Sequence, residues 1–310
     1  MEPLPELGHR AEVQDLQLFE QSGSSQGAGG VAVLASSDCY GRVVLAHCQR
    51  HGAGEPFQVM EVSTLQPHDL LREAGWAGVA VAPGQPTQAA LARHFPKDIT
   101  LFDGTVAVRS IHTVYCPTAV QLLSTQLTAD PAGGPLIAVT EGPQLSLWDV
   151  RGAGRGARVA KLSPGPQHGH FYCLAASDDG SQPLIGAAGV DRSVLVWDPR
   201  TWKLLDRWNN CSKYEVTGLH FSSTNPNHAI VGGMDYEVLC GEWGGNKASR
   251  LGGGNRTGVD MGENSAVQGP SARGLSFRGD SKWMGLAKAA RQDLLAGITA
   301  TSHLYITELG

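Results

Sequence analysis

A sequence motif that recurs six times along the chain limits the folds that this sequence can adopt. Each copy has a short apolar stretch, a turn that contains Asp or Gly, and a second apolar stretch that ends in an aromatic residue and an acid or their equivalents. The clearest copies are residues 183–200 and 135–151. The weaker copies are residues 31–47, 98–104, 229–243 and 294–308. A further apolar stretch precedes each copy, so every repeat contains enough short strands for one small sheet.

The repeat predicts a β-propeller. The copies recur with a period of about 45 residues plus insertions, which is the length of one four-stranded blade, and such a blade must stack against two neighbours around an axis. The preceding apolar stretches, such as 76–82 and 171–177, are expected to be inner strands buried on both faces. We therefore predict an all-β fold, a single propeller over residues 1–310 with six four-stranded blades, and seven blades as the alternative.

The chain ends and one insertion complete this prediction. The last copy stops at Glu308 with no fourth strand after it, so residues 3–7 are expected to pair there and close the ring. Residues 244–273 are rich in glycine and contain no aromatic residue. This composition favours a flexible loop inserted in the fifth blade, which is also the only stretch where a seventh blade could lie.

Composition excludes several classes of protein. The chain has 24 Lys and Arg against 29 Asp and Glu, a net charge of −5, so it lacks the basic character of a nucleic-acid-binding domain. No apolar run approaches the roughly 20 residues that span a bilayer, and the first residues do not resemble a secretory signal. The six cysteines have no zinc-ligand spacing. We expect a soluble protein of the cytoplasm, the nucleus or both, without a metal.

Two copies carry residues that place the repeat in a known class. Gly169-His170 precedes Trp197-Asp198, and Gly8-His9 opens the first repeat in the same way. These repeats resemble the WD-repeat family. The resemblance implies that a histidine, the Asp of the turn and the strand Trp join a hydrogen-bonded network that fixes each blade. The residues expected in this network are His9, Asp38, Trp148, His170, Asp191, Trp197 and Asp235.

The other copies depart from the family's pattern. Ala46, Gly241 and Thr307 stand at the Trp position of the first, fifth and sixth copies, and the second and sixth copies have no Asp in the turn. The resemblance is therefore strong only over residues 136–243.

Two neighbouring copies end in the motif W-D-x-R, at residues 148–151 and 197–200. The motif is similar to the one by which WD-repeat substrate receptors dock on the propeller adaptor of cullin-RING ubiquitin ligases. An Arg just beyond a strand end can project from the rim and contact a partner carboxylate through two hydrogen bonds. The alternative is that each Arg pairs with the Asp beside it. The candidate partner-binding residues are Asp149, Arg151, Asp198 and Arg200.

Motifs of enzymes are lacking. The sequence has no G-x-S-x-G and no H-E-x-x-H, and the glycines and arginines of residues 151–158 lack the strand-loop-helix context of a phosphate-binding loop. His168 and His170 flank a glycine, and one of them is expected to be the structural histidine of its blade. We expect no catalytic residue and no cofactor. A funnel site built from several blades carries no local motif, and a propeller enzyme stays a minor alternative.

The sequence thus favours a non-catalytic scaffold or adaptor that binds other proteins, a step that rests on fold analogy. The sharper hypothesis is a substrate receptor of a cullin-RING ubiquitin ligase. The alternative is a structural subunit of a nuclear-pore, trafficking, ciliary or RNA-processing assembly. In each case the expected partners are proteins, with no nucleic acid, membrane or small-molecule substrate.

Overall fold

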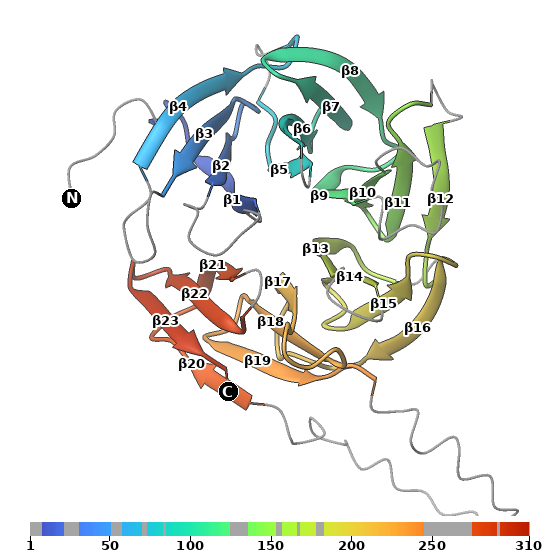
Figure 1. Cartoon of the computed structure of the whole chain (residues 1–310). Helices are drawn as coiled ribbons and strands as arrows, with labels where there is room; N and C mark the ends of the chain where they lie inside the picture. Colours follow the sequence, from blue (N-terminus) through green and yellow to red (C-terminus); the bar gives the residue numbers. More distant parts are fainter. Residues whose placement is uncertain are drawn as a thin grey trace, which may run out of the picture.

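A computed structural model of the chain shows six antiparallel sheets arranged in a ring (Figure 1). The structure describes residues 8–21, 31–50, 58–69, 73–82, 85–124, 136–152, 157–165, 168–177, 183–244, 275–289 and 292–309. Every regular element of two or more residues in these ranges is a strand. The predicted all-β propeller is therefore confirmed, with six blades.

The strands of each blade follow one another in chain order from the centre of the ring outward. Blade 1 contains β1 (Val13–Gln21), β2 (Val31–Asp38), β3 (Val43–Gln49) and β4 (Gln58–Leu65). Blade 2 contains β5 (Ala77–Ala82), β6 (Gln85–Arg93), β7 (Asp98–Asp103) and β8 (Val106–His112). Blade 3 contains β9 (Pro117–Leu123), β10 (Leu136–Glu141), β11 (Gln144–Asp149) and β12 (Arg158–Leu162).

The second half of the ring repeats this order. Blade 4 contains β13 (Phe171–Ser177), β14 (Leu184–Gly189), β15 (Val194–Asp198) and β16 (Lys203–Trp208). Blade 5 contains β17 (Val216–Phe221), β18 (His228–Gly233), β19 (Glu237–Glu242) and β20 (Leu275–Arg278). Blade 6 contains β21 (Trp283–Lys288), β22 (Leu294–Thr299) and β23 (Leu304–Glu308), which are three strands within the described residues.

The predicted closing strand and the predicted glycine-rich loop lie largely outside the described residues. The closing strand is expected at residues 3–7, so the fourth strand of blade 6 stays a prediction. The loop is expected at residues 244–273, with only Gly244 described. The strands on either side of this loop, β19 and β20, pair with each other, as Val238 opposite Phe277 shows. The stretch between these two strands therefore begins and ends in blade 5.

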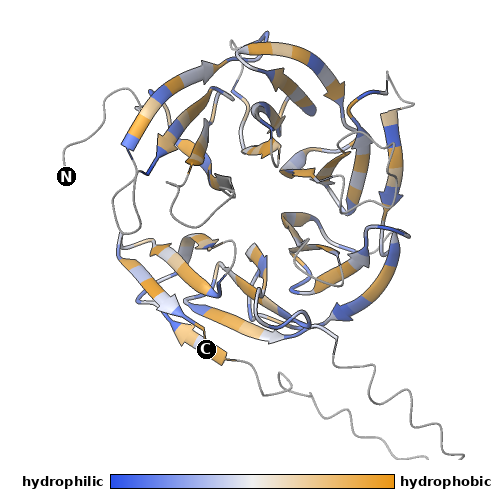
Figure 2. Cartoon of the chain, viewed as in Figure 1, coloured by the Kyte–Doolittle hydropathy of each residue, from blue (hydrophilic) through white to orange (hydrophobic). Residues whose placement is uncertain are grey.

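The core lies between neighbouring blades rather than inside any one of them. Val33 and Leu45 of blade 1 pack with Val79 and Leu91 of blade 2, and similar clusters join each pair of neighbours up to blades 5 and 6. Figure 2 shows the corresponding hydrophobic residues along the strands around the ring. Because both faces of a blade are apolar, each blade depends on its two neighbours.

The inner strands differ in burial. β5 is buried along its whole length, as predicted, but the expectation is wrong for β1 and β21. Leu16 and Leu18 on β1 are 61% and 57% exposed, and Met284 on β21 is 64% exposed. These strands belong to blades 1 and 6, which share no apolar cluster in the described part of the chain, so one face of each strand is left uncovered.

A bulge marks the end of the third strand in four blades. It lies at Phe102, Trp148 and Trp197 in blades 2, 3 and 4, where the aromatic residue precedes an acid. In blade 1 the bulge lies at Cys48, two residues beyond Ala46. The sequence alignment at Ala46 is therefore displaced, because the third strand of blade 1 is longer than the third strands of the other blades.

Trp197 tests the packing between blades. Its side chain is 3% exposed, lies in the cluster shared by blades 3 and 4, and meets Phe171 edge to face with ring centroids 6.2 Å apart. We expect Trp197→Ala to lower the free energy of unfolding by about 3–5 kcal/mol, because it leaves a large cavity in this junction. Thermal unfolding followed by circular dichroism measures the loss. Tyr214→Ala, at a 57% exposed aromatic, is the control, and equal melting curves for both variants would contradict the packing.

Candidate functional site

The two W-D-x-R motifs lie on one face of the ring. Asp149 ends β11 and Asp198 ends β15, which are the third strands of adjacent blades and run in the same sense around the ring. Arg151 and Arg200 lie in the turns that follow. The structure therefore brings the four predicted partner-binding residues to neighbouring points of one rim, which we call the arginine rim.

Each motif folds into the same local loop. The N–H of Arg151 donates to Asp149 Oδ1 over 2.8 Å, and its Nη2 lies 2.9 Å from Asp149 Oδ2. The N–H of Arg200 likewise donates to Asp198 Oδ1 over 2.8 Å, with its Nε 3.3 Å from the same oxygen. Each Arg therefore pairs with the Asp two residues before it, which is the alternative that the sequence left open.

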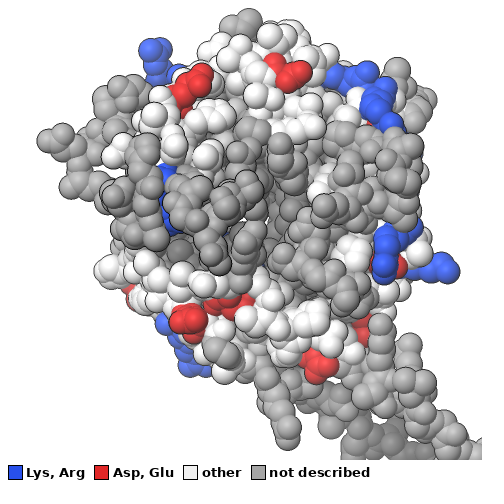
Figure 3. Space-filling view, viewed as in Figure 1, with Lys and Arg blue, Asp and Glu red and all other residues white. Residues whose placement is uncertain are grey.

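The pairing fixes the charges of the rim. The side-chain hydrogen bond from Arg151 lowers the pKa of the Asp149 carboxyl. Burial alone would raise the pKa of Asp198, but the hydrogen bonds from the backbone and side chain of Arg200 outweigh it and the pKa is lowered. Both carboxylates are ionised at neutral pH, and the Arg151 and Arg200 side chains remain 54% and 45% exposed. Figure 3 shows Lys and Arg side chains beside acids over the outer strands β12 and β16.

A third arginine, which the sequence did not single out, supports the rim from blade 2. Arg109 on β8 donates from Nη1 to the carbonyl oxygens of Val150, over 2.6 Å, and of Gly152. These carbonyls belong to the turn that carries Arg151. The loop is therefore held from the neighbouring blade as well as by its own Asp.

The predicted blade network forms in blade 1. His9 Nδ1 lies 3.2 Å from Asp38 Oδ2, and His9 Nε2 lies 2.7 Å from Ser36 Oγ. Asp38 Oδ1 also accepts the N–H groups of Tyr40 and Arg42, each over 3.0 Å. The His9 and Asp38 side chains are both 4% exposed. These contacts join the turn after β2 to the loop before β1, and we call a set of polar contacts at this place in a blade a staple.

In blade 4 the histidine that lies beside Asp191 is His168, and the prediction of His170 is wrong. His168 Nε2 lies 3.0 Å from Asp191 Oδ2, and the same oxygen accepts the N–H of Gly169 over 2.9 Å. His170 is exposed, and its carbonyl accepts the N–H of Val190. The backbone of His170 already bonds to Val190 next to the start of β13. The histidine that lies beside Asp191 is therefore the one two residues earlier, His168.

The two tryptophans occupy the predicted positions. Trp148 is 4% exposed between blades 2 and 3, and its Nε1 donates to Ser146 Oγ over 2.9 Å. Trp197 is buried between blades 3 and 4. Asp235 is also buried in its turn, where it accepts the N–H of Tyr236 over 2.8 Å, but among the described residues no histidine bonds to it.

Blades 3 and 6, which have no Gly-His pair before the first strand, have other staples. In blade 3, Glu141 Oε2 accepts the N–H groups of Val114 and Tyr115, over 2.8 and 3.0 Å. In blade 6 the roles are reversed, because Asp280 lies in the loop before β21 and bonds to Thr299 and to His303 from the turn after β22. The hydrogen bonds from the side chains of that turn lower the pKa of Asp280.

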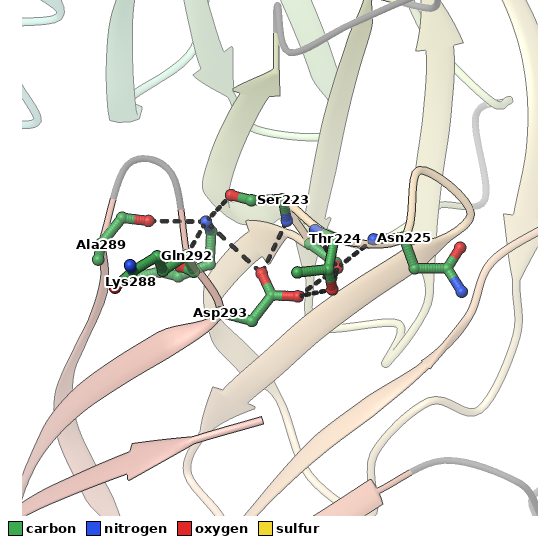
Figure 4. A network of polar contacts seen from close by, with 8 residues as sticks. Ser223, Thr224, Asn225, Lys288, Ala289, Gln292 and Asp293 are labelled. Atoms are coloured by element: carbon green, nitrogen blue, oxygen red, sulfur yellow. Dashed lines mark hydrogen bonds and ion pairs between the residues drawn. The ribbon is translucent and has the colours of Figure 1, made fainter. Parts of the chain in front are cut away.

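A buried cluster clamps blade 6 to blade 5 (Figure 4). Asp293, before β22, accepts hydrogen bonds from the hydroxyls of Ser222 and Thr224, the latter over 2.6 Å, and from the N–H of Ser223 over 2.7 Å. Lys288 Nζ lies 3.7 Å from Asp293 Oδ1, and the two side chains are 9% and 5% exposed. Burial alone would raise the pKa of Asp293, but these hydrogen bonds and the Lys288 charge lower it.

Two hollows open on the surface of the described residues. One, of about 290 Å³ on blade 2, is lined by polar groups that include Thr100 and the ion pair between Arg93 and Asp98, whose Nη2 and Oδ2 atoms are 2.5 Å apart. The other, of about 450 Å³, lies on blade 6 beside Met284 and Ile298. Within the described ranges, no group of three or more His, Cys, Asp or Glu residues could hold a metal ion.

Comparison with known proteins assigns no family. No family model matches the chain, and no curated protein matches it. In the part of the chain that the structure describes, no helix is long and apolar enough to cross a membrane. The propeller architecture is therefore shown by the structure, and membership of the WD-repeat family stays a resemblance.

Asp293 gives the clamp a pH dependence. Its folded pKa lies below the unfolded value of about 4, so its contribution to stability is present above about pH 4 and is lost as the pH falls through the folded pKa. We expect Asp293→Asn to lower the free energy of unfolding at pH 7 by about 2–3 kcal/mol. Urea unfolding at pH 7 and pH 3 measures this loss of stability. We expect a smaller loss at pH 3 than at pH 7. The control is Glu61→Gln, at an exposed acid. A loss of stability in Asp293→Asn that is equal at both pH values would refute the assignment.

Proposed function

We propose that this protein is a non-catalytic platform that binds other proteins, and that the arginine rim is one of its binding surfaces. The duplicated Asp–Arg loop carries the proposal. The loop occurs twice on adjacent blades, with the same N–H to carboxylate bond of 2.8 Å in each. The two arginine side chains are long and cationic, start from turns that are held in place, and have about half of their surface exposed. Such side chains suit the recognition of acidic groups on a partner.

Preorganisation makes this rim a better binding surface than isolated arginines. Each Asp holds its Arg near one orientation, which lowers the conformational entropy lost when a partner carboxylate binds. Arg109 fixes the turn of Arg151 from blade 2 through the carbonyl of Val150. The paired Asp also reduces the net charge of each site, so binding depends on directed hydrogen bonds as well as on long-range attraction.

The finer proposal is a substrate receptor of a cullin-RING ubiquitin ligase. It is supported by the similarity of residues 148–151 and 197–200 to the docking motif of such receptors and by the exposure of Arg151 and Arg200 on one rim. The rim would contact the propeller adaptor of the ligase, and other surfaces of the ring would bind substrates.

A structural subunit of a larger assembly is the second candidate. One observation favours it: blade 6 exposes large apolar side chains, with Leu304 and Ile306 each 67% exposed. Apolar sheet faces of this kind are typical of surfaces that are covered in a stable complex. The two candidates differ in the surface used, since the first depends on the arginine rim and the second does not.

Replacing both arginines of the rim separates these candidates. We expect Arg151→Ala/Arg200→Ala to weaken binding to the purified cullin-RING adaptor at least tenfold, because each truncation removes a charge-assisted contact and about 1.4 kcal/mol corresponds to a factor of ten. Biolayer interferometry with immobilised adaptor measures the dissociation constant. The Arg151→Lys/Arg200→Lys variant should recover only part of the affinity, because a lysine keeps the charge without the planar fork.

Arg278→Ala is the matched control for this experiment. Arg278 on β20 is also an exposed arginine paired with an acid, Glu237, 3.5 Å away. It lies in blade 5, so its loss should leave adaptor binding unchanged. No binding by the wild type, or equal affinity of wild type and the double alanine variant, would reject the ligase-receptor proposal and leave the structural subunit.

A further inference from the structure

The two faces of blade 6 have different surroundings. One face packs on blade 5, where Trp283 is 3% exposed and Leu295 is fully buried. On the opposite face, Ile298 is 44% exposed and Leu304 and Ile306 are each 67% exposed. Ile298 pairs directly with Leu304 across β22 and β23, so these side chains form one continuous patch. We call it the open face of blade 6.

The open face looks toward blade 1, whose described residues do not cover it. The apolar cluster on that side of blade 1 contains Ala32, Ala46 and Cys48 and draws no member from blade 6. Leu16 and Leu18 on β1 are themselves exposed. Every other junction of the ring has one apolar cluster built from both neighbours. The junction between blades 6 and 1 therefore holds two apolar surfaces that do not bury each other.

A hollow of about 450 Å³ deepens one end of the open face. It is lined by Met284, Ile298 and Thr299, with Lys282 at its border. Lys282 lies at the end of the sheet where Trp283 pairs with Thr299. Glu308 lies at the other end, opposite Leu294. The open face is thus an apolar surface with Lys282 at one end, near the pair of Asp280 and His303, and Glu308 at the other end.

Residues 1–7, 22–30 and 245–274 of this chain have little with which to cover such a surface. The stretch 245–274, between β19 and β20, is rich in glycine and contains no aromatic residue. Residues 22–30 contain no large apolar side chain, and residues 1–7 contain two prolines and two glutamates among three large apolar residues. None of these stretches has the alternating apolar pattern of a strand that could face Ile298, Leu304 and Ile306.

We propose that the open face of blade 6 binds a β-sheet element, at least a hairpin, of another polypeptide. The partner carries apolar side chains at alternate positions and packs sheet against sheet, as the blades of this ring do with one another. It carries an acid opposite Lys282 and a base opposite Glu308. This inference deepens the platform role proposed above and uses a surface separate from the arginine rim.

Site-specific photo-cross-linking tests the proposal in the full chain. A photoreactive amino acid replaces Ile306 in one variant and Val108 in another, and both are expressed in the cells from which the chain comes. Val108 on β8 is the matched control, an apolar strand residue that is 59% exposed on a different blade. Mass spectrometry then identifies the cross-linked peptides, and the melting temperature of each variant shows that the ring is folded.

The expected result is an adduct between position 306 and one stretch of another polypeptide that has alternating apolar residues. Position 108 should give no such adduct. A synthetic hairpin of that stretch then binds the purified chain and binds Ile306→Glu at least tenfold more weakly. Adducts only with residues 11–21 of blade 1, adducts only between two copies of this chain, or no adduct at position 306 would each overturn the proposal. The Arg151→Ala/Arg200→Ala variant should give the same adduct, so failure of the arginine rim and failure of the open face are distinguishable.

Discussion

The structure depends on one constraint, which is that each blade is apolar on both faces and cannot bury them alone. A ring of blades is the arrangement that gives every blade two neighbours. Five junctions meet the constraint with clusters that contain large buried side chains, such as Phe102, Trp148 and Trp197. At the sixth, between blades 6 and 1, Leu16 and Leu304 stay exposed. The open face of blade 6 is therefore a consequence of the same rule that builds the core.

Polar contacts give the stacked blades a defined shape. The turn after the second strand is tied to the loop before the first strand by His9 and Asp38 in blade 1, by Glu141 in blade 3 and by Gly169 and Asp191 in blade 4. Each staple is buried or partly buried, so breaking it leaves polar groups unsatisfied. These staples lie at the starts of β11 and β15, at the opposite end of each strand from Asp149 and Asp198. The turns of the arginine rim are held by their own contacts, which are the bonds from Arg151 to Asp149 and from Arg200 to Asp198 and the bond from Arg109 to the Val150 carbonyl.

Local patterns in the sequence predict the blades well and the contacts between distant loops poorly. The Trp-Asp pairs at the ends of β11 and β15, and the His9–Asp38 staple, follow from residues within one repeat. The choice between His168 and His170 depends on where the chain turns into β13, which the residue types do not show. The Asp293 clamp was missed because its partner Ser222 is 71 residues away and neither residue belongs to the repeat pattern. The exposure of Leu304 depends on a neighbouring blade and leaves no mark in the sequence.

Native-state hydrogen exchange tests most directly the central claim that stability comes from burial between neighbouring blades. Amide protection reports the free energy of local opening strand by strand. We expect the slowest exchange in β10, β11, β14 and β15, whose blades are covered on both faces, and faster exchange in β22 and β23, whose blade is covered on one face. Equal protection of β23 and β11 in the purified chain would contradict it, because blade 6 would then be covered on both faces like the others.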